Sequence, residues 1–293
     1  MEYYLFKTRL EIDAYTSITC LFGFPVRHSL SPLLHNYVYI KKKINSVYVC
    51  FQIPPEELKK AVNALKVLKI TGINVTIPHK EKVVKLLDVV DSTARLVGAV
   101  NTIKVLPDGR LIGYNTDAKG FIKALKSYCG FNLKERRVIL CGCGGAGRAV
   151  SVALCIERVK SLQLLDTDGE KACNLACYLR KKFQNIIVEV ASGFGDLRLD
   201  SCDLFVNATP VGMKGEMLPL RLESLNRRSL VYDLVYSKSP TPLVRACRKY
   251  KIRAFNGLSM LVYQAALAEE IWFGRIRGVD SLMFEVLKGA GFI

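Results

Sequence analysis

Hydrophobic and polar residues follow two periods along this chain, and together they predict a regular alternation of strands and helices. In the first 116 residues, alternating or continuous apolar runs predict strands at residues 17–23, 46–52, 72–77, 99–105 and 109–116. Apolar positions at helical spacing predict helices at residues 31–42, 54–68 and 79–90. This alternation is typical of an α/β fold with a mainly parallel sheet.

Proline and serine positions mark the ends of two of these elements. Pro78 cannot donate a backbone hydrogen bond to a sheet, so we expect the strand at 72–77 to end before it. Ser31 directly precedes a proline, which suits a helix N-cap followed by the first helical position. His79 and Lys80 then lie where a strand meets a helix, the place where open α/β sheets bind ligands.

The pattern begins again after residue 117, which indicates a second α/β domain. Short apolar runs predict strands at residues 137–141, 161–166, 186–190, 202–209 and 229–235. Most of them are separated by helical or loop segments. Two apolar helices are expected at the end, at residues 257–274 and 281–290.

A glycine-rich loop opens this second domain. The stretch "VILCGCGGAGRAV" contains G-x-G-x-x-G at Gly142, Gly144 and Gly147, after a predicted strand and before a predicted helix. In that context the loop places a dinucleotide pyrophosphate on backbone N–H groups at a helix N-terminus. The next strand ends in Asp166, close to the ~20-residue spacing of the acid that binds the adenosine ribose. The sequence therefore predicts a Rossmann-type domain.

Asp166 also bears on the choice of cofactor. A carboxylate there accepts hydrogen bonds from the ribose 2′-OH and repels a 2′-phosphate, and the stretch "DTDGEK" contains no arginine. NAD is therefore favoured, with NADP as the alternative. Lys171 in the same stretch argues the other way, because a base there would neutralise a 2′-phosphate.

The composition describes an ordinary globular protein with one unusual number, a formal net charge of +17 over 293 residues. The bases are dispersed in small groups, which favours a solvated surface that attracts small anions over a nucleic-acid-binding protein. No apolar run reaches the ~18 residues of a membrane span, and the first 16 residues do not resemble a signal peptide. We expect a cytoplasmic monomer or homodimer that binds a small molecule.

The cysteines and histidines do not predict a metal site. Ten cysteines are scattered along the chain, and neither the C-x-C at Cys141 and Cys143 nor the pair Cys173 and Cys177 has the spacing of a zinc site. All three histidines lie in the first 80 residues, away from most cysteines. Cys143 lies inside the glycine loop and is a candidate for oxidation.

Eight segments together resemble the shikimate dehydrogenase family. In chain order they are "GFPVRHSLSPLLHN", "GINVTIPHKE", "GAVNTI", "GYNTD", "GCGGAGRA", "NATPVGM", "DLVY" and "GLSMLVYQAA", and they extend from residue 23 to residue 266. The resemblance implies an enzyme that interconverts 3-dehydroshikimate and shikimate with a nicotinamide cofactor. It also implies a substrate-binding domain at residues 1–116, a cofactor domain at 117–256, and C-terminal helices at 257–293 that pack on the substrate domain.

The resemblance further implies roles for individual residues. Lys80 and Asp117 match the catalytic pair, and which of them transfers the proton stays open. Ser29, Ser31 and Tyr236 match groups that hold the substrate carboxylate. Groups that bind the ring hydroxyls and the reacting oxygen are matched by Asn74, Thr76, Asn101 and Gln264. Cofactor contacts are matched by Gly142, Gly144, Gly145, Ala146, Gly147, Asp166, Thr209, Met213 and Gly257.

Two alternatives remain at this point. Within the family, the substrate could be quinate, alone or together with shikimate; Ser29 and Ser31 favour shikimate, because a bulkier threonine is expected in a quinate-preferring enzyme. In another class, the chain would be a non-catalytic, basic nucleic-acid-binding or regulatory protein on the same fold, although Lys80 and Asp117 are both present. The family commonly carries Asn-Arg-Thr where this chain has Asp166-Thr167-Asp168.

Overall fold

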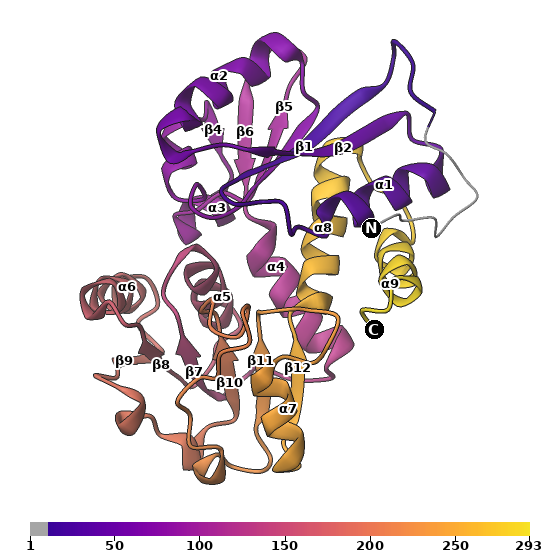
Figure 1. Cartoon of the computed structure of the whole chain (residues 1–293). Coiled ribbons are helices and arrows are strands. Elements are labelled where there is room, and N and C mark those ends of the chain that lie inside the picture. The colour runs from indigo at the N-terminus through magenta and orange to yellow at the C-terminus, as the bar shows by residue number, and fades with distance from the viewer. Residues whose placement is uncertain (1–10) are drawn as a thin grey trace. The chain divides into compact units, whose positions relative to one another are not determined.

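The computed structural model describes residues 11–293, which form two compact units (Figure 1). Unit 1 contains the chain up to Thr116 together with Val262–Ile293, and unit 2 contains Asp117–Leu261. Residues 1–10 of the segment that we compared with a signal peptide lie outside the described residues. In the part of the chain that is described, no helix has the length and apolar character needed to span a bilayer.

Unit 1 is built on a six-stranded mixed sheet in the order β2-β1-β3-β5-β6-β4. β1 pairs in parallel with β2 and β3, whereas β5 is antiparallel to both β3 and β6. The strands are β1 (Ser17–Gly23), β2 (Ser46–Gln52), β3 (Gly72–Val75), β4 (Val89–Val90), β5 (Thr102–Val105) and β6 (Leu111–Tyr114). The helices are α1 (Ser31–Lys42), α2 (Leu58–Leu68), α3 (Ser92–Val97), α8 (Leu258–Phe273, most of which lies in unit 1) and α9 (Val279–Gly289).

One predicted helix of unit 1 is wrong. Residues 79–90 form a short 3₁₀ helix at Lys82–Leu86 followed by the strand β4, and not an amphipathic α-helix. The backbone of β4 pairs with β6, and the N–H of Asp88 donates to the carbonyl of Leu111 (3.1 Å). Pairing with an existing strand satisfies these backbone groups, and the apolar side chains still reach the core around Val83.

The start of α1 also differs from the prediction. Leu30 is the N-cap and Ser31 is already helical, so Ser31 does not cap the helix. The hydroxyl of Ser29 instead accepts a hydrogen bond from the backbone N–H of Ser31 (3.2 Å). An oxygen two residues earlier therefore satisfies one of the N–H groups that a helix leaves free at its start.

Unit 2 is a doubly wound sheet with every strand parallel, in the order β12-β11-β10-β7-β8-β9. Numbered from β7, this is the strand order 3-2-1-4-5-6 of a dinucleotide-binding fold, whose ligand lies where the order reverses, between β7 and β10. The strands are β7 (Arg137–Cys141), β8 (Ser161–Leu165), β9 (Ile187–Val190), β10 (Leu204–Asn207), β11 (Leu230–Asp233) and β12 (Arg253–Asn256). The helices are α4 (Thr116–Lys123), α5 (Gly145–Ile156), α6 (Gly169–Lys182) and α7 (Pro242–Lys249).

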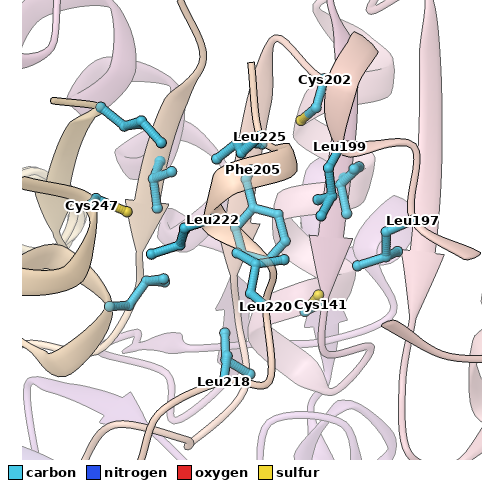
Figure 2. Packing of buried hydrophobic residues seen from close by; sticks show 14 of the residues in the cluster. Cys141, Leu197, Leu199, Cys202, Phe205, Leu218, Leu220, Leu222, Leu225 and Cys247 are labelled. Atoms are coloured by element: carbon cyan, nitrogen blue, oxygen red, sulfur yellow. The ribbon is translucent and has the colours of Figure 1, made fainter. Parts of the chain in front are cut away.

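One buried apolar cluster covers a face of this second sheet (Figure 2). Phe205 of β10 lies at its centre, and the leucines of the segment between β10 and β11 surround the ring. Cys141, Cys202 and Cys247 are buried in the same cluster as small apolar side chains. This packing fixes the ends of β7 and β10, from which the predicted cofactor loops begin.

Candidate active site

A buried network of polar side chains lies at the centre of unit 1. Asn74 of β3 accepts a hydrogen bond from the hydroxyl of Tyr48 (2.8 Å), and its amide donates to Thr102 Oγ1 (3.2 Å) and to the carbonyl of Asn101 (3.3 Å). Asn74 is 6 % exposed and Asn101 is 3 % exposed. Because buried polar groups are stable only when they are paired, these bonds fix the orientation of both amides.

Asn101 connects this network to α4 and α8. Its side-chain oxygen accepts from the backbone N–H of Thr116 (2.8 Å), and its amide donates to Thr116 Oγ1 (2.9 Å) and to Gln264 Oε1 (3.5 Å). The structure thus brings together three of the predicted substrate residues: Asn74, Asn101 and Gln264. They come from β3, from the segment before β5 and from α8.

Each of the two catalytic candidates is connected to a neighbour of this network, Lys80 by a backbone hydrogen bond and Asp117 by the chain itself. The carbonyl of Lys80 accepts a hydrogen bond from the N–H of Val100 (2.8 Å), so the Lys80 backbone is fastened beside Asn101. Asp117 follows Thr116 directly in α4 and is 5 % exposed. His79, the residue before Lys80, is fully buried, and its Nε2 lies 2.7 Å from the carbonyl oxygen of Ile53. That contact fixes the turn carrying Lys80.

Of the other predicted substrate residues, Ser31 reaches this network through the Tyr48 hydroxyl. Within residues 11–293, Ser29, Thr76 and Tyr236 make no direct hydrogen bond to its side chains. Ser29 and Ser31 are joined to each other at the start of α1, with Ser29 half-buried. Thr76 follows β3 and is held through its backbone, its N–H donating to the carbonyl of Phe22 (2.8 Å). Tyr236 follows β11 in unit 2, and burial raises the pKa of its hydroxyl.

Reasoning from the sequence missed Tyr48, Thr102 and Thr116 in this network. Thr102 and Thr116 stand inside the quoted segments "GAVNTI" and "GYNTD", so those segments contained the signal. Tyr48 lies in the apolar strand "SVYVCFQ", where a tyrosine is ordinary core. Only the structure shows that its hydroxyl meets Asn74.

In unit 2, the glycine loop has the geometry of a phosphate-binding turn. Gly142 has φ +98, a conformation that favours glycine. A Cβ at Gly147 would lie 1.9 Å from the carbonyl oxygen of Gly142, so α5 packs against the loop with no room for a side chain. Gly144, Gly145 and Ala146 are partly exposed at the N-terminus of α5. Their N–H groups fit an anionic diphosphate.

The Asp166 carboxylate fastens this loop. Its Oδ2 accepts from the backbone N–H of Cys143 (2.6 Å), and its Oδ1 accepts from the N–H of Asp168 (3.0 Å). Both oxygens therefore already accept hydrogen bonds from the chain. The Lys171 amine lies 3.7 Å from the position that a Cβ on Gly144 would occupy. The positive charge of Lys171 is therefore close to the glycine loop.

The remaining cofactor candidates lie on the loops after β10 and β12. Asn207 Oδ1 accepts from both the N–H (3.0 Å) and the hydroxyl (2.7 Å) of Thr209, and its amide donates to buried Asp233 (2.8 Å). Met213, on the same loop, is 56 % exposed. Gly257 precedes α8 and is buried, its N–H donating to the carbonyl of Val235 (3.2 Å).

Cys143 is poorly suited to oxidation, contrary to the expectation from its place in the loop. Its side chain is fully buried, and burial together with the nearby Asp166 charge raises its pKa to about 12. The thiolate is the reactive form, so this thiol is unreactive near neutral pH.

Comparison with known proteins identifies the family to which this chain is similar. Residues 21–103 match the family described as "Shikimate dehydrogenase substrate binding domain", and residues 257–276 match "Shikimate 5'-dehydrogenase C-terminal domain". A protein of Caldanaerobacter subterraneus subsp. tengcongensis named "Shikimate dehydrogenase (NADP(+))" is 40 % identical over 290 residues, 96 % of this chain and 99 % of that protein.

Two solved structures share the whole fold. Shikimate dehydrogenase of Aquifex aeolicus is 37 % identical with a TM-score of 0.86, covering 95 % of this chain and 100 % of that one. Shikimate 5-dehydrogenase of Listeria monocytogenes, solved in complex with shikimate and NAD, is 32 % identical with a TM-score of 0.86, covering 96 % of this chain and 99 % of that one.

These comparisons overturn the preference for NAD. Relatives at 39–40 % identity are named for NADP(+), and the expectation drawn from Asp166 is wrong. Two features of the loop fit NADP: the backbone N–H groups of Cys143 and Asp168 donate to the Asp166 carboxylate and offset part of its charge, and the Lys171 amine lies close to the same loop. With its two α/β units, its glycine loop and relatives of this similarity over nearly its full length, the chain belongs to the shikimate dehydrogenase family.

Proposed function

We propose that this protein catalyses the reversible, NADP-dependent reduction of 3-dehydroshikimate to shikimate. The observation that supports it best is the buried network of unit 1. There Thr102 Oγ1 bridges the side chains of Asn74 and Asn101, and the Asn101 amide donates to Gln264 Oε1. A ring that carries several hydroxyl groups requires an array of oriented donors and acceptors. A site that is built to bond hydroxyl groups rejects analogues that lack them.

Lys80 and Asp117 are proposed to transfer the proton to or from the reacting oxygen of the substrate. The bound nicotinamide supplies or accepts the hydride at the carbon that becomes the alcohol carbon. A ketone reduced in this way also needs a proton on its oxygen from a group within hydrogen-bond reach. Lys80 carries protons to donate, and its backbone is fixed beside the Asn101 segment. Asp117 is proposed to orient it or to share the proton.

The substrate carboxylate is proposed to bind Ser29 and Ser31, with help from Tyr236. Hydroxyl donors suit a carboxylate, since bonds to charged acceptors are stronger than neutral ones. Ser29 already accepts from the N–H of Ser31, so its own hydroxyl hydrogen is free to point at a ligand. Thr76 is proposed to bind a ring hydroxyl.

NADP is proposed to bind unit 2 through the backbone at Gly144, Gly145 and Ala146. The 2′-phosphate requires a cation, and Lys171 stands over Gly144. Arg148 is a second base near the loop: its positive charge lies close enough to the Cys143 thiol to oppose the rise in the pKa of that thiol. These two cations, in a chain with a net charge of +17, suit a ligand with an additional phosphate.

The division of labour between the two units stays part of the proposal: substrate binding in residues 1–116, cofactor binding in 117–256, and C-terminal helices at 257–293. A cytoplasmic location, the absence of nucleic-acid binding and a monomeric or homodimeric state stay predictions as well. Elution from heparin only at high salt, together with a shift of labelled DNA or RNA in a gel, would contradict the predicted absence of nucleic-acid binding.

Steady-state rates with shikimate and quinate, each measured with NADP and NAD, test the proposal. We expect kcat/KM to be highest for shikimate with NADP. A higher kcat/KM for quinate would assign the protein to quinate oxidation, and no turnover of either substrate would refute the proposed function.

A further inference from the structure

Helices α1 and α8 of unit 1 share a buried ionisable pair that lies apart from the residues proposed to bind substrate. His35 Nδ1 contacts Glu269 Oε1 in a short hydrogen bond, and both side chains are fully buried. Among the described residues, His35 Nε2 and Glu269 Oε2 have no hydrogen-bond partner of good geometry, but the Tyr39 hydroxyl lies near Glu269: burial first and then the Glu269 charge raise the pKa of Tyr39. Such a pair adds little net stability and is better suited to fixing one arrangement of its surroundings.

The imidazole of His35 fixes an aromatic ring. It is stacked on the ring of Tyr48, with centroids 4.2 Å apart and planes 4° apart, and Trp272 lies against it at 5.5 Å. The carboxylate of Glu269 sets the rotation of the imidazole, because the Nδ1 contact allows only one orientation in the plane. Glu269 therefore orients the His35 imidazole, and the imidazole in turn holds the Tyr48 ring stacked on it.

Tyr48 connects the His35–Glu269 pair to the predicted substrate site through its hydroxyl group. Its hydroxyl donates to Asn74 Oδ1 (2.8 Å), so the Asn74 oxygen is occupied and its amide is turned toward Asn101 and Thr102. Tyr48 is 1 % exposed; burial raises the pKa of its hydroxyl, and a hydrogen bond to Ser31 acts in the opposite direction. The one hydroxyl therefore lies near both Asn74 and Ser31.

We propose that His35, Glu269 and Tyr48 are positioning residues for the substrate: the pair holds the Tyr48 ring, and the Tyr48 hydroxyl holds the Asn74 amide in its binding orientation. This inference rests on the proposed function. Asn74 binds the ring in the ground state and the transition state alike, so losing its orientation raises KM and leaves kcat unchanged.

Two substitutions at Glu269 separate the hydrogen bond from the volume of the side chain. Glu269→Leu keeps the bulk and removes the bond to His35, and we expect the KM for shikimate to rise about tenfold, the scale of one hydrogen bond. Glu269→Gln keeps an amide oxygen that accepts from His35, and we expect it to restore a KM near that of the wild type. Glu270→Leu, at the neighbouring exposed position, is the matched control.

Tyr48→Phe tests the link itself, because it keeps the stack on His35 and removes the one oxygen that meets Asn74 and Ser31. We expect a similar rise in KM, and in a double-mutant cycle Glu269→Leu should add nothing further in the Tyr48→Phe background. The emission of Trp272, the single tryptophan of the chain, checks that the packing around His35 survives in each variant.

Additive effects in the cycle, or a Tyr48→Phe enzyme with the wild-type KM, would overturn the inference. The Tyr48→Phe result decides the matter even where Glu269→Leu does not fold. A wild-type protein that neither binds nor oxidises shikimate would instead refute the proposed function. A fall in melting temperature with an unchanged KM would assign the pair a purely structural role and also overturn the inference.

Discussion

The two units of this protein prepare their predicted sites in different ways. In unit 1 the substrate candidates meet through side chains, as Asn74 and Asn101 do around Thr102. In unit 2 the cofactor candidates meet largely through the backbone, as at Gly142 and Gly147, where side chains are excluded by space and by φ. Recognition in unit 1 therefore depends on which groups the side chains carry, and recognition in unit 2 depends on how closely the backbone can approach.

This difference decides what a substitution does in each unit. Removing a side-chain group in unit 1 deletes one donor or acceptor and leaves the fold of the site in place. Adding a single carbon to the loop of unit 2 displaces several N–H groups together.

Lys80→Ala should lower kcat by a factor of about 10² or more, the usual scale for removing a positioned acid or base. Binding of shikimate should change far less, since Lys80 is proposed to act on the proton. Stopped-flow or steady-state oxidation of shikimate measures the change. Lys82→Ala, at an exposed position two residues on, is the control. A variant that keeps near wild-type turnover would remove Lys80 from the catalytic pair.

Gly147→Ala should lower kcat/KM for NADP by up to about 10²-fold, because a displacement of about 1 Å in a binding loop can cost that much. The added Cβ would lie 1.9 Å from the Gly142 carbonyl oxygen, so the loop must move. Gly169→Ala, with nothing within 4 Å of its Cβ, is the matched control. Calorimetric binding of shikimate should be unchanged in both variants. Equal affinity for NADP in both would mean that the loop does not carry the cofactor.

Most strands of both sheets could be predicted from the sequence, because their apolar residues and bounding turns act locally. The helix at 79–90 could not, since pairing of Val89–Val90 with a strand more than 20 residues later decided its form. Strand β12 (Arg253–Asn256) was also missed; its residues are half-exposed at a sheet edge and lack a strong apolar pattern.

Motifs located the candidate site, but they did not reveal the partners of its side chains. Asp166 stands at the spacing of a ribose-binding acid, yet its oxygens accept from Cys143 and Asp168. Tyr48 is ordinary core by its pattern, yet its hydroxyl meets Asn74. Spacing along the chain fixes where a residue stands on its element, whereas hydrogen-bond partners depend on segments that are distant in the sequence.

Lys171→Ala should lower kcat/KM for NADP by about tenfold or more, since a hydrogen bond to a charged group contributes about 1.5–3 kcal/mol. With NAD, which lacks the 2′-phosphate, the change should be small. Lys181→Ala, at an exposed position on the same helix, is the control. An equal loss with both cofactors would mean that Lys171 acts on the diphosphate or on the loop rather than on the 2′-phosphate.

The smallest effect is expected at Cys143, although it lies in the middle of the cofactor loop. Its pKa is raised to about 12, first by burial and then by the Asp166 charge, so the thiolate is the form that the fold disfavours. At pH 8 the thiolate fraction is about 10⁻⁴, and alkylation requires the thiolate. Iodoacetamide at pH 8 should therefore modify the exposed Cys173 and Cys177 and leave both Cys143 and the activity intact. Peptide mapping by mass spectrometry measures the modification. Rapid labelling of Cys143 with loss of NADP binding would mean that the loop opens in solution, and the contrast between a rigid backbone site in unit 2 and a side-chain site in unit 1 would then fail.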